Sequence, residues 1–354
     1  MRVKSFYNIL LLFLSVIVTL IFCELFYLGY VHFQKPLHRP SSIPNLGWEL
    51  TPGAELVKDN IEGIPITYFV NLSGFRDKTK GIWDKWESDD IKIAYIGNSV
   101  TWGEGVEYKD TYSGVIESTF SKTTLPIKTA NFGIAGSNTL QHFAVLKNMA
   151  LQLNPNIIIL GYYLNDIERR RTQKLPSILQ FILRHYHFSS FLMGRITTVL
   201  ENWNAQIPAN LPPKTEKIIK KETSCEGYAK RIINGYGTTA WEDTKAVILS
   251  MSELCRQEGV KFGVVIFPFE TQVRGICPYT PQEMLSSFLS KNGISFLDIA
   301  KIFENYSSKT KLYLEGDIGH PNNLGHKIAG ESISRWLISE PEFGDVFKDL
   351  SIRN

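Results

Sequence analysis

The sequence predicts an α/β fold, in which helices cover both faces of a parallel β-sheet. Two observations predict it. Short runs of Ile, Val and Leu, each long enough for one buried strand, recur along the chain, and segments with the apolar spacing of helices separate them. Strands that alternate with helices pair in parallel, because each crossover helix returns the chain to the same end of the sheet.

The strands and helices are expected to alternate from residue 91 onward. The strand candidates are residues 91–96, 127–132, 156–160, 261–267 and 293–297. The helix candidates are residues 112–120, 140–153, 244–258 and 332–338. Together these elements predict one sheet domain over residues 91–340.

One long segment, residues 168–241, interrupts the alternation. It contains no clear strand and includes a strongly apolar part at residues 177–200. We expect a helical insertion over the carboxyl edge of the sheet, the edge at which the parallel strands end. A lid, a membrane-facing surface and a helix pair that merely packs on the side remain equally open.

An apolar segment near the N-terminus, residues 9–31, is about as long as a helix that crosses a bilayer. We expect residues 1–31 to be an uncleaved membrane anchor. The alternative, a cleaved signal peptide, needs a small-x-small cleavage site, which the sequence lacks after Thr19. Arg2 and Lys4 precede the segment, so the positive-inside rule places the N-terminus in the cytoplasm. The sheet domain would then be extracytoplasmic, in the periplasm or at the cell surface.

Residues 32–90 join the expected anchor to the sheet domain as a linker and a small lead-in module. Residues 32–53 are rich in Pro, Ser and Gly, a composition typical of a tether. A strand candidate at residues 64–70 lies inside a hairpin-like module over residues 47–76, which we expect to pack against the main domain.

Charge and cysteine content exclude several classes of function. The formal net charge of +3 is small, whereas nucleic-acid binding favours a concentrated basic face, so we expect no nucleic-acid partner. The four cysteines form no CxxC pair and no Cys/His cluster with zinc spacing, so we expect no metal site. In an oxidising compartment Cys225 and Cys277, which flank loops around the insertion, should pair, and Cys255 should stay buried in its helix.

The expected sheet domain contains four short blocks that are rich in Gly, Ser, Asn and Asp. They are residues 97–99, 136–138, 161–166 and 317–321. The first three blocks follow strand candidates, so they should meet at the carboxyl edge of the sheet, where open α/β sheets bind their ligands. The fourth lies in a loop before the closing helix.

The residues in these blocks suit nucleophilic acyl chemistry. That chemistry needs a serine, a base that deprotonates it, and a third group that orients the base. Ser99 is the candidate nucleophile, His320 the base and Asp317 its orienting group. An ordinary turn serine is the alternative interpretation of Ser99. Donors must also await the developing oxyanion, and the candidates are the backbone N–H groups of Ser99 and Gly136 with the Asn165 side chain.

In this order and spacing, the four blocks resemble those of the SGNH (GDSL-like) hydrolase superfamily over about residues 91–336. The resemblance implies a flavodoxin-like three-layer α/β/α sandwich with a central parallel sheet. It also implies ester chemistry through an acyl-enzyme on the serine, without metal or cofactor. The family roles fall on Ser99, Gly136, Asn165, Asp317 and His320.

The first and third blocks depart from the family pattern. Asn98 stands where the family usually has Asp, so the side chain keeps its acceptor but loses the charge. More residues separate Gly161 from Asn165 than in the compact pattern, which leaves Asp166 as a lesser candidate for a role in the site.

Two other residues compete for roles in the second and fourth blocks. Gly133 competes with Gly136, which we prefer because the Ser-Asn-Thr stretch follows it. His326 competes with His320, but we expect it inside the closing helix and without an Asp at the right spacing before it.

These observations predict a membrane-anchored serine esterase that acts on O-acyl esters, such as O-acetyl groups on a cell-envelope glycan or lipid. An O-acyltransferase with the same triad, which modifies a cell-surface polysaccharide, is the first alternative. A non-catalytic membrane-anchored scaffold is the second, and the intact Ser/Asp/His set counts against it.

Overall fold

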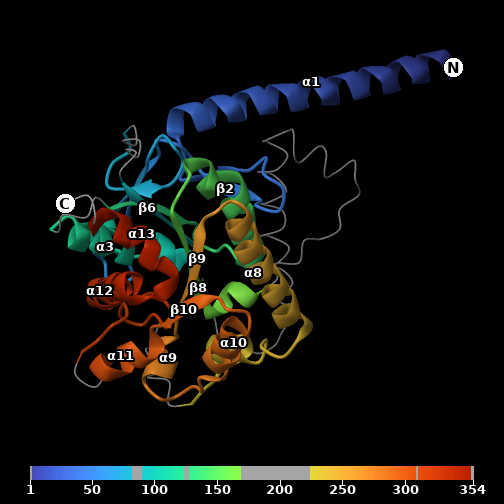
Figure 1. The fold of residues 1–354 in the computed structure, drawn as a ribbon. Helices are drawn as coiled ribbons and strands as arrows, with labels where there is room; N and C mark the ends of the chain where they lie inside the picture. The colour runs from blue at the N-terminus through green and yellow to red at the C-terminus, as the bar shows by residue number, and fades with distance from the viewer. Residues whose placement is uncertain (1, 82–89, 123–126, 169–223, 308–309, 352–354) are drawn as a thin grey trace.

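The computed structural model describes residues 2–81, 90–122, 127–168, 224–307 and 310–351. Its centre is an eight-stranded sheet with the order β10-β9-β8-β6-β7-β5-β4-β3. Five of these strands are mutually parallel: β6 (Ile91–Gly97), β7 (Ile127–Gly133), β8 (Ile157–Tyr163), β9 (Lys261–Phe267) and β10 (Ser295–Asp298). Helices cover both faces of the sheet (Figure 1), so the predicted α/β sandwich is confirmed, and its sheet is mostly parallel.

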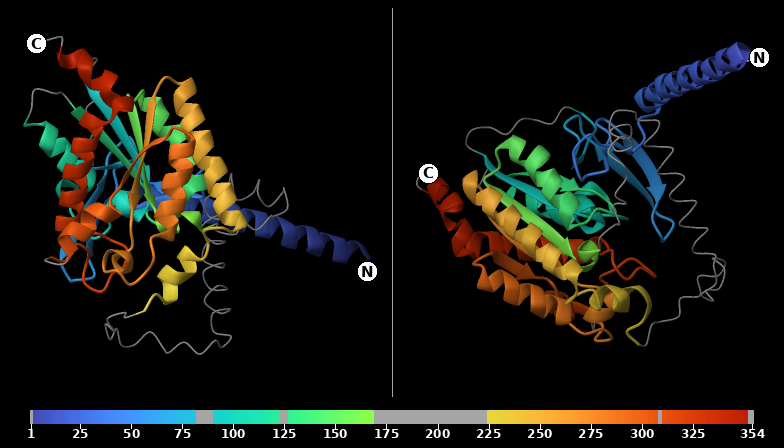
Figure 2. Two further views of the ribbon diagram at one scale, coloured as in Figure 1. Left: turned by 60° about the horizontal axis from the view of Figure 1, so that its bottom comes forward. Right: turned by 90° about the vertical axis from the view of Figure 1, so that its right-hand side faces the viewer.

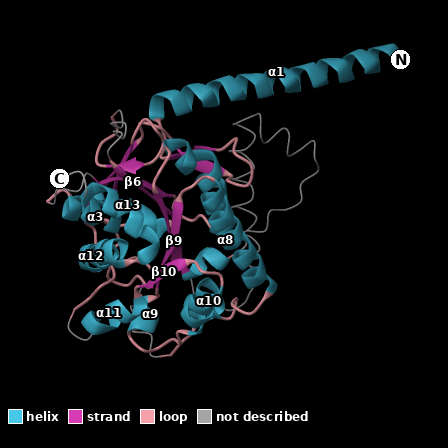
Figure 3. Ribbon diagram, in the orientation of Figure 1, coloured by secondary structure: helices cyan, strands magenta, loops and turns pink. Residues whose placement is uncertain are grey.

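The helices form two layers, one on each side of the sheet (Figures 2 and 3). α3 and α12 pack together on one face, and α4 and α8 pack together on the other. The helices that follow α1 are α2 (Ser99–Trp102), α3 (Tyr112–Phe120), α4 (Thr139–Val145), α7 (Gly227–Ile233), α8 (Thr239–Gln257), α9 (Glu270–Val273), α10 (Thr280–Lys291), α11 (Ala300–Ser307), α12 (Asn323–Ser339) and α13 (Gly344–Ser351). Short 3-10 turns lie at Tyr108–Asp110, Leu151–Leu153, Leu164–Ile167 and Pro341–Phe343, and a π turn at Leu146–Ala150 follows α4.

The central strands are buried on both faces, which explains why their sequences are continuous apolar runs. All seven residues of β8 are buried, and so are the last five residues of β6. Side chains such as Ile93 and Ile159 have no exposed surface. Each such side chain stabilises the fold by roughly 1.5–3 kcal/mol through burial.

The lead-in hairpin is hydrogen-bonded into the main sheet. β3 (Glu55–Asp59) and β4 (Pro65–Val70) pair antiparallel, and β5 (Arg76–Asp77) joins β4 to β7. The sheet is therefore mixed, with an antiparallel edge on its parallel part. Part of the expected tether is also structured, because β1 (His38–Pro40) and β2 (Trp48–Leu50) form a small antiparallel pair.

The closing helix α12 is longer than predicted. It begins at Asn323, capped by the Asn322 side chain that accepts from the Gly325 N–H. The apolar spacing predicted a helix only from residue 332, although His326 was expected inside the closing helix. Gly325 and Gly330 interrupt the apolar pattern of this helix, and both allow close packing against neighbouring segments. A Cβ atom on Gly325 would lie 2.2 Å from the Leu312 carbonyl oxygen, and one on Gly330 would lie 2.8 Å from the Val115 side chain.

The N-terminal helix α1 (Arg2–Gln34) projects away from the sheet domain (Figure 1). Its segment Tyr7–Tyr30 has 24 residues with a mean hydropathy of 2.8, and none of its most apolar window is buried. At about 1.5 Å per residue this segment is long enough to cross a hydrocarbon core of about 30 Å. A membrane anchor and a signal sequence both fit this length and composition.

A disulfide joins Cys225, just before α7, to Cys277, which follows α9. Cys255 is free and buried in α8. The expected pairing is thus confirmed. Residues 169–223, which include the apolar part of the expected insertion at 177–200, lie outside the described residues; α7 and the start of α8 form its described remainder.

The cysteine arrangement predicts a specific pattern of thiol reactivity. Burial raises the pKa of the Cys255 thiol to about 12, so this thiol is both inaccessible and protonated at neutral pH. Cys255 should resist iodoacetamide in the native protein and react after unfolding, and Cys225 and Cys277 should react only after reduction. Peptide mapping of native, unfolded and reduced samples checks this. Labelling of Cys225 without reductant would contradict the pairing.

Candidate active site

Ser99 lies at a sharp turn where β6 ends and α2 begins. The turn is tight because Gly97, at the end of β6, has no side chain: a Cβ there would lie 2.1 Å from Thr101 Oγ1 and 2.7 Å from the Gly161 carbonyl oxygen. Asn98 caps α2 by accepting a hydrogen bond from the Val100 N–H at 2.9 Å. Ser99 is therefore the first residue of α2, at the carboxyl edge of the parallel strands.

Ser99, His320 and Asp317 form a continuous hydrogen-bonded series. His320 Nε2 lies 2.8 Å from Ser99 Oγ, and His320 Nδ1 lies 2.7 Å from Asp317 Oδ2. The side chains of His320 and Asp317 keep 25% and 22% of their surface exposed, so the series is reachable from solvent. Ser99, at the start of α2, and His320, in the loop before α12, are 221 positions apart along the chain.

The Asp317 carboxylate is held in its charged form. Burial alone raises its pKa, but the hydrogen bond and charge attraction of His320, with hydrogen bonds from the Gly319 and His320 N–H groups, outweigh burial and leave the pKa below its ordinary value. Asp317 thus fixes both the backbone of its own loop and the ring of His320. With the carboxylate as acceptor, the His320 tautomer with a proton on Nδ1 leaves Nε2 free to accept from Ser99.

The loop that carries His320 is anchored by the lead-in hairpin. The Leu314 N–H donates to the His320 carbonyl at 3.0 Å, which closes the loop on itself. Glu62, at the tip of the β3–β4 hairpin, accepts from the Glu315 N–H at 2.8 Å. Residues before the sheet domain therefore position the loop of the candidate base.

The three expected oxyanion donors lie at the ends of β6, β7 and β8. Gly136 has a positive φ of 74°, which its turn requires and which suits glycine. Within the described residues, the peptide N–H groups of Ser99 and Gly136 donate to no protein acceptor. Gly133, the competitor of Gly136, donates its N–H to Asn131 Oδ1 and lies against the backbone of Trp102.

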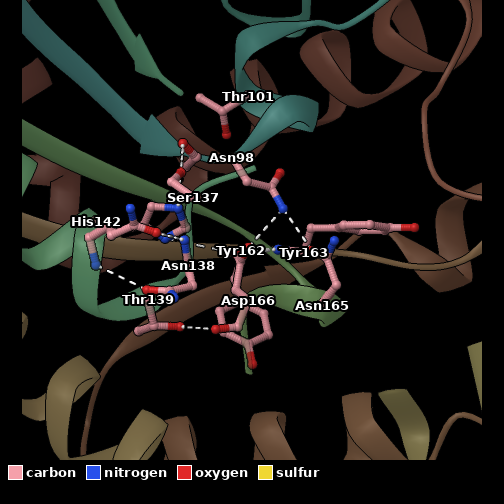
Figure 4. A network of polar contacts seen from close by, with 12 residues as sticks. Asn98, Thr101, Ser137, Asn138, Thr139, His142, Tyr162, Tyr163, Asn165 and Asp166 are labelled. Atoms are coloured by element: carbon pink, nitrogen blue, oxygen red, sulfur yellow. Dashed lines mark hydrogen bonds and ion pairs between the residues drawn. The ribbon is translucent and has the colours of Figure 1, made fainter. Parts of the chain in front are cut away.

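Asn165 follows β8 in the 3-10 turn Leu164–Ile167 and points toward Asn98 (Figure 4). Its Oδ1 accepts from Asn98 Nδ2 at 2.8 Å, and its Nδ2 donates to the Tyr228 hydroxyl at 3.0 Å. Asn165 lies four residues after Gly161 because β8 continues to Tyr163 before the turn begins.

Beneath these residues lies a buried polar network (Figure 4). Asp166 accepts from Asn98 Nδ2 at 2.7 Å and from the Tyr163 N–H at 3.0 Å. His142 Nε2 lies 2.9 Å from Ser137 Oγ, and His142 Nδ1 lies 3.8 Å from Asp166 Oδ2. The network links the first three blocks, so Asp166, the lesser candidate, supports the site from below and faces Asn98.

Burial shapes the charges of this network. It raises the pKa of Asp166 well above its ordinary value and lowers the pKa of His142 to about 3. His142 is therefore neutral at physiological pH, and its contact with Asp166 is not a full ion pair. The Asn98 amide suits its two partners, because an Asp at this position would have no N–H groups to donate to Asn165 and Asp166.

His326, the competitor of His320, lies fully buried in α12. Its Nδ1 accepts a hydrogen bond from the Tyr112 N–H at 3.2 Å, and burial lowers its pKa to about 3. The described structure thus gives His326 a packing role between α3 and α12. Among the described residues, no group of three or more His, Cys, Asp or Glu side chains could hold a metal ion.

Arg76 is a residue of the site that sequence reasoning missed. Its fully buried guanidinium donates to the Trp102 carbonyl, to the Gly103 carbonyl at 2.7 Å and to the Val106 carbonyl at 2.6 Å. The same group lies 4.7 Å from the ring centre of Tyr68 and 4.8 Å from that of Trp102. Burial lowers its pKa to about 10, so it stays charged at neutral pH.

Arg76 thereby places a positive charge at the carboxyl end of α2, the helix that begins with Ser99. Cations are favourable at that end of a helix, where the last carbonyl groups have no partner within the helix. No local pattern marks this residue, since its partners lie 26 to 30 positions further along the chain.

Comparison with known proteins finds similar folds. No protein-family model matches the sequence, and no curated protein matches it. A lipase/acylhydrolase from Enterococcus faecalis is similar with 13% identity and a TM-score of 0.42, covering 70% of this chain and 94% of that chain. An acetyl xylan esterase is similar with 13% identity and a TM-score of 0.41, covering 70% and 100%. A member of the lipolytic protein G-D-S-L family from Veillonella parvula has 14% identity and a TM-score of 0.40, covering 70% and 98%.

Removing the Arg76 guanidinium should destabilise the fold. Arg76→Met leaves three buried carbonyl groups without their charged donor, so the free energy of unfolding should fall by about 3 kcal/mol or more. Arg76→Lys keeps the charge without the planar fork, so its loss should be smaller. Guanidinium chloride unfolding measures both. Arg335→Met on the exposed side of α12 is the matched control, and equal stability of Arg76→Met and this control would contradict the assignment.

Proposed function

We propose that the chain is a serine esterase of the SGNH type, which hydrolyses O-acyl esters through an acyl-enzyme on Ser99. The observation that carries the proposal is the hydrogen-bonded series of Ser99, His320 and Asp317, with contacts of 2.8 and 2.7 Å. A serine, a base and an orienting carboxylate in this geometry are the parts of an activated nucleophile.

In the first half of the reaction, Ser99 Oγ attacks the ester carbonyl carbon while His320 Nε2 takes the hydroxyl proton. The carbonyl oxygen becomes an oxyanion, which the Ser99 and Gly136 N–H groups and the Asn165 amide would stabilise. The tetrahedral intermediate collapses, its bond to the alcohol oxygen breaks, and the imidazolium of His320 gives its proton to that oxygen. The acyl group is then bonded to Ser99, and the alcohol leaves.

In the second half, His320 takes a proton from water as the water oxygen attacks the acyl carbon. The second tetrahedral intermediate releases the carboxylic acid, and the proton returns to Ser99 Oγ. Asp317 stays ionised throughout and stabilises the imidazolium, which its lowered pKa supports. No metal or cofactor takes part in any of these steps.

We further propose that α1 anchors the enzyme, with the N-terminus in the cytoplasm and the sheet domain in the periplasm or at the cell surface. The apolar segment Tyr7–Tyr30 and the disulfide Cys225–Cys277 support this, because disulfides persist in oxidising compartments. The substrate class that fits this location is an acylated glycan or lipid of the cell envelope, with O-acetyl groups as the leading case. In this division residues 1–31 form the anchor, 32–90 the lead-in and 91–340 the hydrolase domain.

The test of the proposal is turnover of aryl acetate esters and acetylated glycans by the detergent-solubilised full chain. Ser99→Ala and His320→Ala should each reduce kcat by at least about 1,000-fold, because the residual rate comes from binding and the oxyanion hole alone. Both variants should keep the circular dichroism spectrum and unfolding midpoint of the wild type.

Ser290→Ala is the matched control for the serine substitution. Ser290 lies exposed in α10, which leads into the amino end of β10, so it is at the opposite edge of the sheet from Ser99. It should keep the wild-type rate. A folded Ser99→Ala protein with wild-type turnover would refute the assignment of Ser99 as the nucleophile. The non-catalytic scaffold would then be the better interpretation.

Hydrolysis and acyl transfer share the acyl-enzyme and differ in what attacks it. Water needs only the triad and the oxyanion donors described above, so free acid should be the main product when an activated ester acylates the enzyme in the presence of glycan. The measurement follows free acid and acylated glycan together while the glycan concentration rises. Dominant acylated glycan at modest acceptor concentration, with slow hydrolysis, would replace the esterase by an O-acyltransferase.

A further inference from the structure

A tyrosine from outside the four blocks contacts the candidate oxyanion hole. We propose that Tyr228 is a positioning residue that orients the Asn165 amide, an inference that rests on the proposed esterase function. Tyr228 lies in α7, 63 positions beyond Asn165, and its hydroxyl is 3.0 Å from Asn165 Nδ2.

The Asn165 amide is held at both of its ends. Asn98 Nδ2 donates to the oxygen end at 2.8 Å, and the Tyr228 hydroxyl accepts from the nitrogen end at 3.0 Å. Asn98 is itself oriented, because its own oxygen accepts from the Val100 N–H at 2.9 Å. An amide with both ends fixed in this way has one favourable orientation, since the reverse orientation would place its N–H groups toward the donor Nδ2 of Asn98.

The Tyr228 hydroxyl donates one hydrogen bond and accepts another. It donates its proton to Glu168 Oε2 at 3.3 Å, which directs a lone pair toward Asn165. Burial, the largest cause, raises the pKa of Tyr228 to about 12, so the hydroxyl keeps its proton at neutral pH. Arg231 forms an exposed ion pair with the same Glu168 side chain.

The ring of Tyr228 packs against two neighbours, and a disulfide lies close to it along the chain. Phe269 packs against it edge to face with a centroid distance of 6.1 Å, and the Arg231 guanidinium lies 5.0 Å from its centroid. On the same helix, Ala229 is buried in the core. The disulfide at Cys225, three residues before Tyr228, ties this end of α7 to Cys277.

This arrangement leaves one donor for the reaction. The Asn165 Nδ2 group carries two N–H bonds, and Tyr228 accepts one of them. The second N–H remains for the oxyanion. A donor oriented before the reaction needs no reorganisation when charge develops, so the loss of Tyr228 should slow the chemical step more than it weakens substrate binding.

The test is a double-mutant cycle on kcat and KM with an aryl acetate and the solubilised full chain. Tyr228→Phe should lower kcat about three- to tenfold with KM unchanged, the size expected when one hydrogen bond is lost. Asn165→Ala should lower kcat about 100-fold or more. In the Asn165→Ala background, Tyr228→Phe should have no further effect, because the group through which it acts is absent.

Tyr306→Phe is the matched control, since Tyr306 is an exposed tyrosine on α11, and it should keep the wild-type kcat. An equal kcat for Tyr228→Phe and wild type, additive effects in the double variant, or a raised KM with unchanged kcat would each overturn the inference while the esterase function stands. A folded wild-type protein that turns over no ester would instead refute the proposed function, and the inference with it.

Discussion

The side chain of Asn98 is the contact on which the rest of the candidate site depends. Its oxygen caps α2, and its nitrogen donates to both Asn165 and Asp166. One amide therefore fixes the start of the helix that carries Ser99 and the turn that follows β8. A buried amide that meets three partners is costly to disturb, because each lost bond leaves a polar group without water. The hydrogen bonds of Asn98 therefore fix residues 97–99 and residues 161–166 relative to each other.

The other end of α2 is fixed from a distant part of the chain. Arg76 extends from the antiparallel edge of the sheet and binds the carbonyl groups where α2 ends. A four-residue helix has little stability of its own, because it forms too few hydrogen bonds to offset the free-energy cost of helix nucleation. The cap at Asn98 and the cation at Arg76 hold it from both sides. The lead-in hairpin, which also contacts the His320 loop through Glu62, is thus part of the scaffold of the site.

The elements that the sequence predicted best are those whose burial is uniform. The bounds of β9 agree with the prediction at both ends, because a strand buried on both faces is a continuous apolar run with polar neighbours. The start of α12 was missed because Gly325 and Gly330, which allow close helix packing, remove the apolar signal. For the site, motif order predicted Ser99 and His320 as partners, and their side chains lie within hydrogen-bonding distance. Arg76 and Tyr228 had no such signal, because their partners are set by the tertiary fold.

The disulfide joins the two sides of the site. Cys225 precedes α7, whose Tyr228 contacts Asn165, and Cys277 follows α9, whose Glu270 N–H donates to the Ile318 carbonyl in the loop of His320. The bond spans 52 positions, and closing a loop of that size stabilises a fold by about 4 kcal/mol in the chain-entropy account. That stabilisation arises in the unfolded chain; in the folded protein the same bond keeps Cys225 beside Cys277 and so limits how far α7 can move from the segment 268–277. In an oxidising compartment this covalent link adds to the buried contacts of Ala229, Ile232 and Ile233 that keep α7 beside the site.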